Sequence, residues 1–155
     1  MDFQVVRKEA LPSTFRTMNS DRPDTVGARI RSTRLELGAT IRQLAEQCSL
    51  TPEGLSMIER DVTGVGLPVL RRISAALGKP VSYLGKFEML PVETLGQKIK
   101  KARLYRGLSK TELAREMNVD VKSIHNWESD KRLPSNNNVI LLLMELLTVL
   151  DDCLS

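Results

Sequence analysis

The only histidine and the only tryptophan of the chain, His125 and Trp127, stand two positions apart. Such a pair could serve catalysis, or the indole ring could stack on a ligand. General acid–base or nucleophilic catalysis by the imidazole would need a carboxylate or a nucleophile placed to work with it, and the sequence offers neither. We therefore predict no catalytic residue and look for another role for the two rings.

Residues that could bind a metal or a cofactor are sparse. Cys48 and Cys153 lie far apart, and neither has a second thiol or a histidine at metal-ligand spacing. The chain also lacks a glycine-rich loop that could cradle phosphates. The sequence thus predicts a protein that is not an enzyme and holds neither a metal nor a cofactor. Two isolated cysteines fit a reducing cytoplasm.

Charge and length narrow the partners. The 155 residues carry a formal net charge of +4, with a sequence pI near 9.3, which permits nucleic acid as a partner without requiring it. Residues 1–24 mix acidic and basic side chains and contain no apolar run long enough for a signal peptide or a membrane span. We expect a flexible N-terminal tail there and no membrane partner.

The chain repeats itself at one fixed offset. Gly38 recurs 69 positions later as Gly107. The same offset relates Ile30 to Ile99, Arg34 to Arg103, Leu44 and Ala45 to Leu113 and Ala114, Leu55 to Ile124, Glu59 to Glu128, and Leu77 to Leu146. An unbroken register of this kind indicates two copies of one small domain. We expect a first domain at 25–84, a linker at 85–92 and a second domain at 93–155.

Within each copy the apolar spacing is helical. In the second copy Gly107 can end a first helix in the left-handed conformation. Ser109 and Glu112 then have the spacing of a capping box for a helix over 110–117, and Asp120 can cap a third helix. A last helix follows Pro134. The first copy predicts helices over 26–37, 41–48, 52–60 and 67–77, so the expected fold class is all-α.

Two short helices joined by about four residues have the geometry of a helix-turn-helix. The stretch "GLSKTELAREMNVDVKSIHNWESDKRLPS" resembles the lambda-repressor-like, Cro-type helix-turn-helix family. The first copy, "GATIRQLAEQCSLTPEGLSMIERD", resembles it less closely, with Ile41 where a polar, phosphate-facing residue is common. Both copies also lack the glycine usual in the turn. The resemblance implies two tandem domains of four to five short helices each, with a recognition helix around 121–129.

A recognition helix lies in the major groove with its N-terminal residues facing base edges. Asn126 could bond adenine N6 and N7, and Lys122 could donate to guanine O6 and N7. His125 either reads a base or is an ordinary surface residue. The candidate phosphate contacts are Ser109, Lys110, Ser123, Lys131 and Arg132. The basic first helix "QKIKKARLYR" is either a solvated face that steers polyanions or a further contact.

Other residues have structural readings. Trp127 shares a helix face with Ile124 and should pack inward, with stacking on DNA as the alternative. The resemblance also implies that an arginine of the first helix pairs with the glutamate closing the recognition helix. This implies the structural ion pairs Arg34–Glu59 and Arg103–Glu128 and removes both arginines from the DNA contacts.

These observations favour a cytoplasmic, sequence-specific transcriptional regulator of double-stranded DNA, acting as a repressor. The alternative is an antitoxin-like or other interaction protein in which one copy, most naturally the first, binds a protein partner. The helix over 137–150 is apolar on nearly all sides. It should therefore form a homodimer, unless its extra face packs on the first copy or the N-terminal tail.

Overall fold

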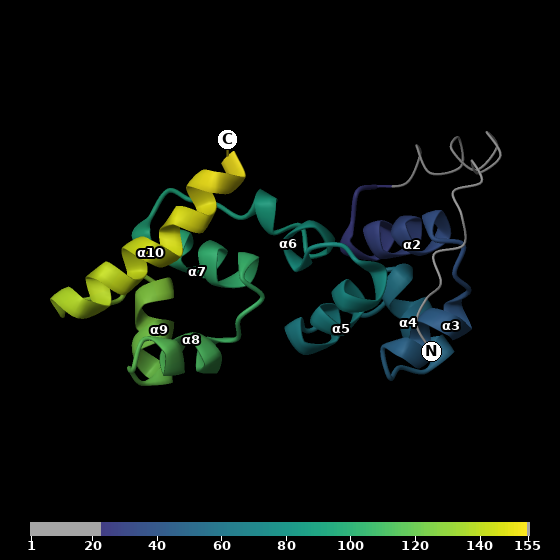
Figure 1. Cartoon of the computed structure of the whole chain (residues 1–155), viewed down its shortest axis with the longest axis horizontal. Coiled ribbons are helices and arrows are strands. Elements are labelled where there is room, and N and C mark those ends of the chain that lie inside the picture. The colour runs from purple at the N-terminus through teal and green to yellow at the C-terminus, as the bar shows by residue number, and fades with distance from the viewer. Residues whose placement is uncertain (1–22, 155) are drawn as a thin grey trace. The chain divides into compact units, whose positions relative to one another are not determined.

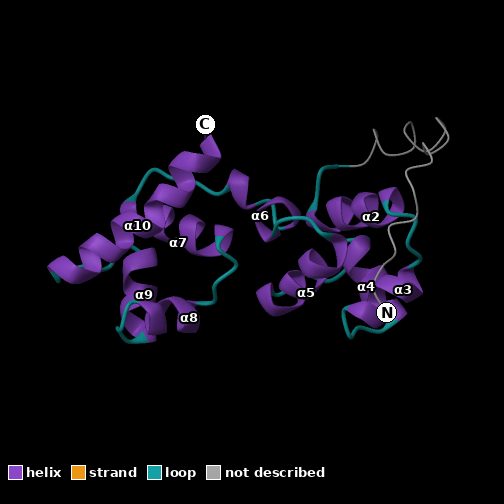
Figure 2. Cartoon of the chain, in the orientation of Figure 1, coloured by secondary structure: helices purple, strands orange, loops and turns teal. Residues whose placement is uncertain are grey.

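The computed structural model describes residues 23–154, with side chains described for residues 23–150. Its elements are α2 (Val26–Glu36), α3 (Ile41–Gln47), α4 (Pro52–Glu59), α5 (Leu67–Leu77), α6 (Val81–Leu84), the 3-10 helix η1 (Phe87–Met89), α7 (Leu95–Tyr105), α8 (Lys110–Glu116), α9 (Val121–Glu128) and α10 (Asn137–Leu154) (Figure 1). No strand occurs in the described part of the chain (Figure 2). The predicted all-α fold class is confirmed.

The helices fall into two compact units, which divide between Pro80 and Val81. The helix α6, which we expected to close the first domain at residue 84, packs on η1 and α7 and so belongs with the second unit. The domain limits 25–84, 85–92 and 93–155 stay a prediction. The expected tail at 1–24 lies almost wholly outside the described residues, and nothing within residues 23–154 is a helix long and apolar enough to cross a membrane.

Six of the helices begin at residues whose side chains cap them. Each of six N-cap side chains accepts a hydrogen bond from a backbone N–H three residues on: Thr25, Thr40 and Thr51 in the first unit, and Thr94, Ser109 and Asp120 in the second. Such a cap satisfies an N–H that has no partner inside the helix. The turn between α8 and α9 passes through Asn118 at φ 52°, a left-handed conformation that asparagine tolerates.

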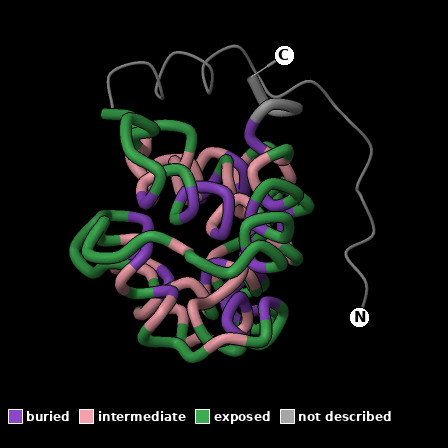
Figure 3. Tube along the Cα trace, turned by 90° about the vertical axis from the view of Figure 1, so that its left-hand side faces the viewer, coloured by how far each residue is buried: buried purple, intermediate pink, exposed green. Residues whose placement is uncertain are grey.

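Each unit has its own core, and buried stretches alternate with exposed ones along the chain (Figure 3). In the second unit the buried cluster comprises Ile99, Ala102, Leu113, Ala114, Met117, Ile124, Trp127, Val139, Leu143, Leu146 and Leu150. The first unit buries Ile30, Leu44, Leu55, Leu70, Ile73 and Leu77. Trp127 is only 8% exposed and so contributes to the core. This burial orients α9 relative to α7 and α8.

The final helices of the two copies pack differently. The helix α5 ends at Gly78, which adopts a left-handed conformation, whereas Leu147 occupies that position in the second copy and α10 continues. Ile73 of α5 is fully buried, but its counterpart Leu142 is 39% exposed. Accordingly α5 packs on α2 and α3, whereas the main contacts of α10 are with α7. The second copy is therefore not a full structural repeat of the first.

The segment predicted as a linker, 85–92, is docked onto the second unit. The ammonium of Lys101, on α7, donates to the carbonyl oxygens of Glu88 and Leu90 at 2.8 and 3.0 Å. Lys101 is 6% exposed, although the "QKIKKARLYR" helix was expected to present its cations to solvent. Two of the three donors of this ammonium are used within the chain and the side chain is buried, so it is not available to contact DNA.

Candidate nucleic-acid interface

Two buried ion pairs tie the third helix of each unit to the first. Arg103 Nε and Nη2 donate to Glu128 Oε1 and Oε2 at 2.5 and 3.1 Å, and Nη1 donates to the carbonyl oxygen of Leu108 at 2.7 Å. Arg34 makes the matching contacts to Glu59 at 2.6 and 2.8 Å. All four side chains are at most 6% exposed. The hydrogen bonds of the two guanidinium groups therefore hold α4 and α9 against the first helix of their unit.

A second set of contacts joins the N-terminal end of α7 to the residue that follows the C-cap of α9. Asp130, just after α9, accepts hydrogen bonds from the Gly96 N–H at 2.9 Å and from the Thr94 hydroxyl at 2.6 Å. A side chain at Gly96 would place its Cβ 2.3 Å from the Trp127 carbonyl oxygen, so α7 and α9 can approach this closely only with glycine there. Sequence reasoning missed this cluster.

The repeat itself carries the signal that would have revealed it. Gly27, Asp61 and Thr25 form the same cluster in the first unit, with hydrogen bonds of 3.0 Å from the Gly27 N–H and 2.5 Å from the Thr25 hydroxyl. These residues stand 69 positions before their counterparts. A polar triad that recurs in register across the two copies predicts a shared structural contact.

The proposed base readers on α9 are not equivalent. Lys122 and His125 are exposed, whereas Asn126 is half-buried and lines a pocket beside the helix. Lys122 and His125 lie three positions apart and so face the same side of α9. The structure therefore presents two of the three predicted readers openly and turns the third partly inward.

Lys110, the first residue of α8, contacts two residues of α9. Its ammonium lies 3.2 Å from His125 Nδ1 and 3.7 Å from Glu128 Oε2. An ammonium has only donors, so Nδ1 must accept, and a neutral ring then carries its proton on Nε2. The Lys110 side chain is 39% exposed, so it remains accessible while it orients the imidazole. Sequence reasoning placed Lys110 against a phosphate and missed this contact.

The other phosphate candidates differ in availability. The side chains of Ser109 and Ser123 already take part in helix caps: Ser109 Oγ accepts from the Glu112 N–H at 3.2 Å, and the Ser123 hydroxyl donates to Asp120 at 3.0 Å. The backbone and hydroxyl donors of Ser123 hold the pKa of Asp120 below its usual range. Lys131 and Arg132 are exposed on the loop after α9. Of the five phosphate candidates, only these two are exposed.

Comparison with known families agrees with this geometry. A helix-turn-helix family model matches residues 30–84 and again residues 99–146, which together exceed half of the chain. The chain belongs to the Cro-type helix-turn-helix family. The double match confirms the resemblance and the two tandem copies. Neither the curated proteins nor the solved structures contain a match.

Membership makes the protein a DNA-binding helix-turn-helix protein. Its two helix-turn-helix copies nevertheless expose different chemistry. Where the second has Lys122, His125 and Asn126, the first has Glu53, Ser56 and Met57. Ile41 stands in place of Lys110, and Val62, 61% exposed, stands in place of Lys131. The first helix-turn-helix retains the scaffold with fewer cations on its outer face.

Among the described residues, no group of three His, Cys, Asp or Glu side chains could hold a metal ion.

Proposed function

We propose that this protein is a cytoplasmic, sequence-specific transcriptional regulator that represses by occupying its DNA site with residues 121–129 in the major groove. The observation that carries the proposal is the outer face of the second copy. There Lys122 and His125 are exposed on a helix whose other side is buried and clamped to α7. Lys131 and Arg132 extend beyond the end of this helix, where a phosphate backbone would pass.

The bases that this helix would recognise follow from the hydrogen-bond donors on its exposed side chains. Lys122 donates to guanine O6 and N7, and the Nε2–H of His125 donates to an acceptor on a purine edge. Asn126 can bond adenine bidentately once its amide turns out of the adjoining pocket. A good bidentate contact contributes about 1–3 kcal/mol of discrimination between bases. Lys131 and Arg132 add affinity that carries no sequence preference.

Selection of bound sites from random duplexes, followed by binding isotherms on a selected and a scrambled duplex, tests this proposal. We expect Lys122→Ala and Asn126→Ala each to weaken specific binding by about 1–3 kcal/mol and to relax base preference. The matched controls are Glu53→Ala and Met57→Ala, which stand at the same positions of the first copy. If the controls abolish discrimination while the second-copy variants leave it intact, the assignment of the reading helix is wrong.

We also propose that α10 forms a homodimer. Its buried side packs in the second unit, while Leu141 and Met144 on the opposite side are 62% and 61% exposed. A pair of reading helices spaced about 34 Å apart would bind two half-sites in adjacent major grooves. Sedimentation of the full chain should show a concentration-dependent dimer, and Leu141→Glu with Met144→Glu should give a monomer. A wild-type monomer at all concentrations that still binds its site tightly would refute the dimer.

The first copy supports a second candidate function, the binding of a protein partner as in an antitoxin. Its counterpart of the reading face carries Glu53, Met57 and the exposed Val62. An acid near phosphates is unfavourable, whereas an apolar and acidic face suits a protein surface. Co-purification of one stoichiometric partner from the native host, lost on Val62→Lys and retained on Lys131→Ala, would favour this function.

A further inference from the structure

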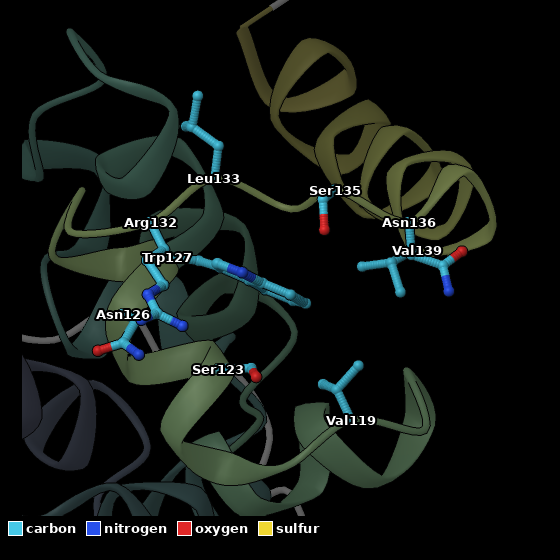
Figure 4. A pocket seen from close by; sticks show the side chains of 9 residues that line it. All are labelled: Val119, Ser123, Asn126, Trp127, Arg132, Leu133, Ser135, Asn136 and Val139. Carbon is cyan, nitrogen blue, oxygen red and sulfur yellow. The ribbon is translucent and has the colours of Figure 1, made fainter.

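A pocket of about 230 Å³ lies between α9, the loop that follows it and the start of α10. Its lining residues are Val119, Ser123, Asn126, Trp127, Arg132, Leu133, Ser135, Asn136 and Val139. In Figure 4 the Trp127 indole extends into this space, with Asn126 and Arg132 at one side of the view and Val139 at the other. The pocket therefore has an aromatic wall, aliphatic side chains and polar groups on more than one side, with its one cation, Arg132, beside Asn126.

The polar groups of the pocket have bonding capacity to spare. No hydrogen bond or ion pair with another described residue engages the side chain of Asn126, Trp127 or Arg132. Every fully buried polar side-chain atom among the described residues does have a partner, so the unpartnered indole N–H of Trp127 is not fully buried. An indole N–H, an amide and a guanidinium offer mainly donors. All three residues line the same pocket.

Charge and size define what would fit. The lining contains one cation, Arg132, and no acidic residue, so an anion would be attracted. The guanidinium fork matches a carboxylate, which it can bind with two parallel hydrogen bonds. The indole face and Val139 suit a flat ring beside it. A volume of about 230 Å³ is below the roughly 300–1,000 Å³ of pockets for drug-sized ligands, so one ring is the natural size.

We propose that this pocket is an effector site for a small, planar aromatic carboxylate. The ring stacks on Trp127, the carboxylate pairs with Arg132, and the Asn126 amide completes the site. The consequence rests on the proposed function: Asn126 and Arg132 are also expected to contact DNA, so bound effector and bound DNA exclude each other. A ligand that binds only the DNA-free state shifts the protein away from its operator and acts as an inducer.

The sole tryptophan lies in the pocket wall, so its fluorescence reports binding directly. Benzoate added to the full chain should quench Trp127 saturably. Benzamide, which has the same ring without the charge, should bind at least about tenfold more weakly, as should benzoate to Arg132→Gln. Arg115→Gln removes the same charge from an exposed site in the same unit that does not line the pocket. It should leave benzoate affinity unchanged.

Ser135→Phe tests the site without altering its charge. The exposed Ser135 lines the pocket, so phenylalanine there should fill the volume and abolish benzoate quenching while helix content is retained. Absence of saturable quenching in the wild type, or equal affinities for benzoate and benzamide, would overturn the effector site. Binding of benzoate with no weakening of DNA affinity would overturn the exclusion of DNA. A chain that binds benzoate but no DNA would instead refute the proposed function.

Discussion

The two copies contain the same buried ion pair in different surroundings, which permits a comparison within one chain. Arg34→Met and Arg103→Met each remove the guanidinium, its two bonds to the carboxylate and its bond to a backbone carbonyl. Each leaves a glutamate that is at most 4% exposed without its partner. Breaking a buried pair by removing one member costs about 3–5 kcal/mol, because the remaining charge stays desolvated.

In the second copy Lys110 can partly replace the positive charge of Arg103. Lys110 Nζ lies 3.7 Å from Glu128 Oε2, whereas Ile41 occupies that position in the first copy. Since Lys110 is 39% exposed, solvent limits its help to about 1 kcal/mol. Arg103→Met should therefore cost up to about 1 kcal/mol less than Arg34→Met. The order should reverse for the glutamates, because Glu128→Gln leaves two cations facing each other and Glu59→Gln leaves one.

Each unit has its own probe of unfolding. Trp127 fluorescence reports the second unit. Thiol labelling of Cys48 reports the first, because the folded thiol is buried and burial raises its pKa, with a smaller opposing effect of Arg72. Cys153→Ser removes the competing thiol. Urea midpoints with unchanged m-values give the free energies. The reasoning is refuted if the arginine and the glutamate substitutions rank the two copies in the same order. It is also refuted if Arg103→Met still costs less than Arg34→Met when Lys110 is replaced by isoleucine.

Three further substitutions test single contacts. Gly96→Ala should destabilise the second unit by about 1–3 kcal/mol in urea unfolding, because its Cβ would lie 2.3 Å from the Trp127 carbonyl oxygen; unchanged stability would show that the helices can separate freely. Lys110→Ile should weaken discrimination at the base read by His125 as much as His125→Ala does, and additive losses in the double variant would contradict the contact between them. The folded-state pKa of Asp120 is lowered, so its stabilising effect is present above the unfolded pKa of about 3.9 and is lost as pH falls through the folded value. Asp120→Asn keeps the cap without that titration. If acid unfolding followed by Trp127 fluorescence has the same pH dependence in the wild type and in Asp120→Asn, the predicted effect of Asp120 is wrong.

Much of the fold could be predicted because local and repeated signals agree. The cap residues Ser109 and Asp120, the helical apolar spacing and the offset of 69 residues all specify the same helices. The packing of the last helix could not be predicted in this way. Gly78 and Leu147 differ at one aligned position, and the loss of the glycine stop lets α10 extend to Leu154. Which side of an almost wholly apolar helix becomes buried is not encoded in its periodicity.

For the candidate site, the exposure of side chains along α9 could be predicted from the sequence, but their contacts with other elements could not. The exposure of Lys122 and His125 follows from their spacing relative to the buried Ile124 and Trp127. The half-buried placement of Asn126 does not, because the pocket that it lines is formed with the loop after α9 and with the start of α10, which lie outside the periodicity of α9. The contact between Lys110 and His125 likewise joins two helices across the turn. Contacts of this type need the packed structure rather than helix periodicity.

Comparison of the two copies also distinguishes residues that hold the helices together from the residues that we propose contact DNA. The first copy retains the clamp of Arg34 with Glu59 and the cluster of Gly27 with Asp61, although its outer face has lost the lysines of the second. If these contacts served DNA binding, their retention beside Glu53 would bring no benefit. These contacts are better explained as structural: they keep the third helix of each copy at a fixed angle to the first helix, whichever side chains the third helix exposes. A chimaera that transfers 121–126 into positions 52–57 should therefore fold and acquire base preference, and a well-folded chimaera without any would show that reading also needs Lys110, Lys131 and Arg132.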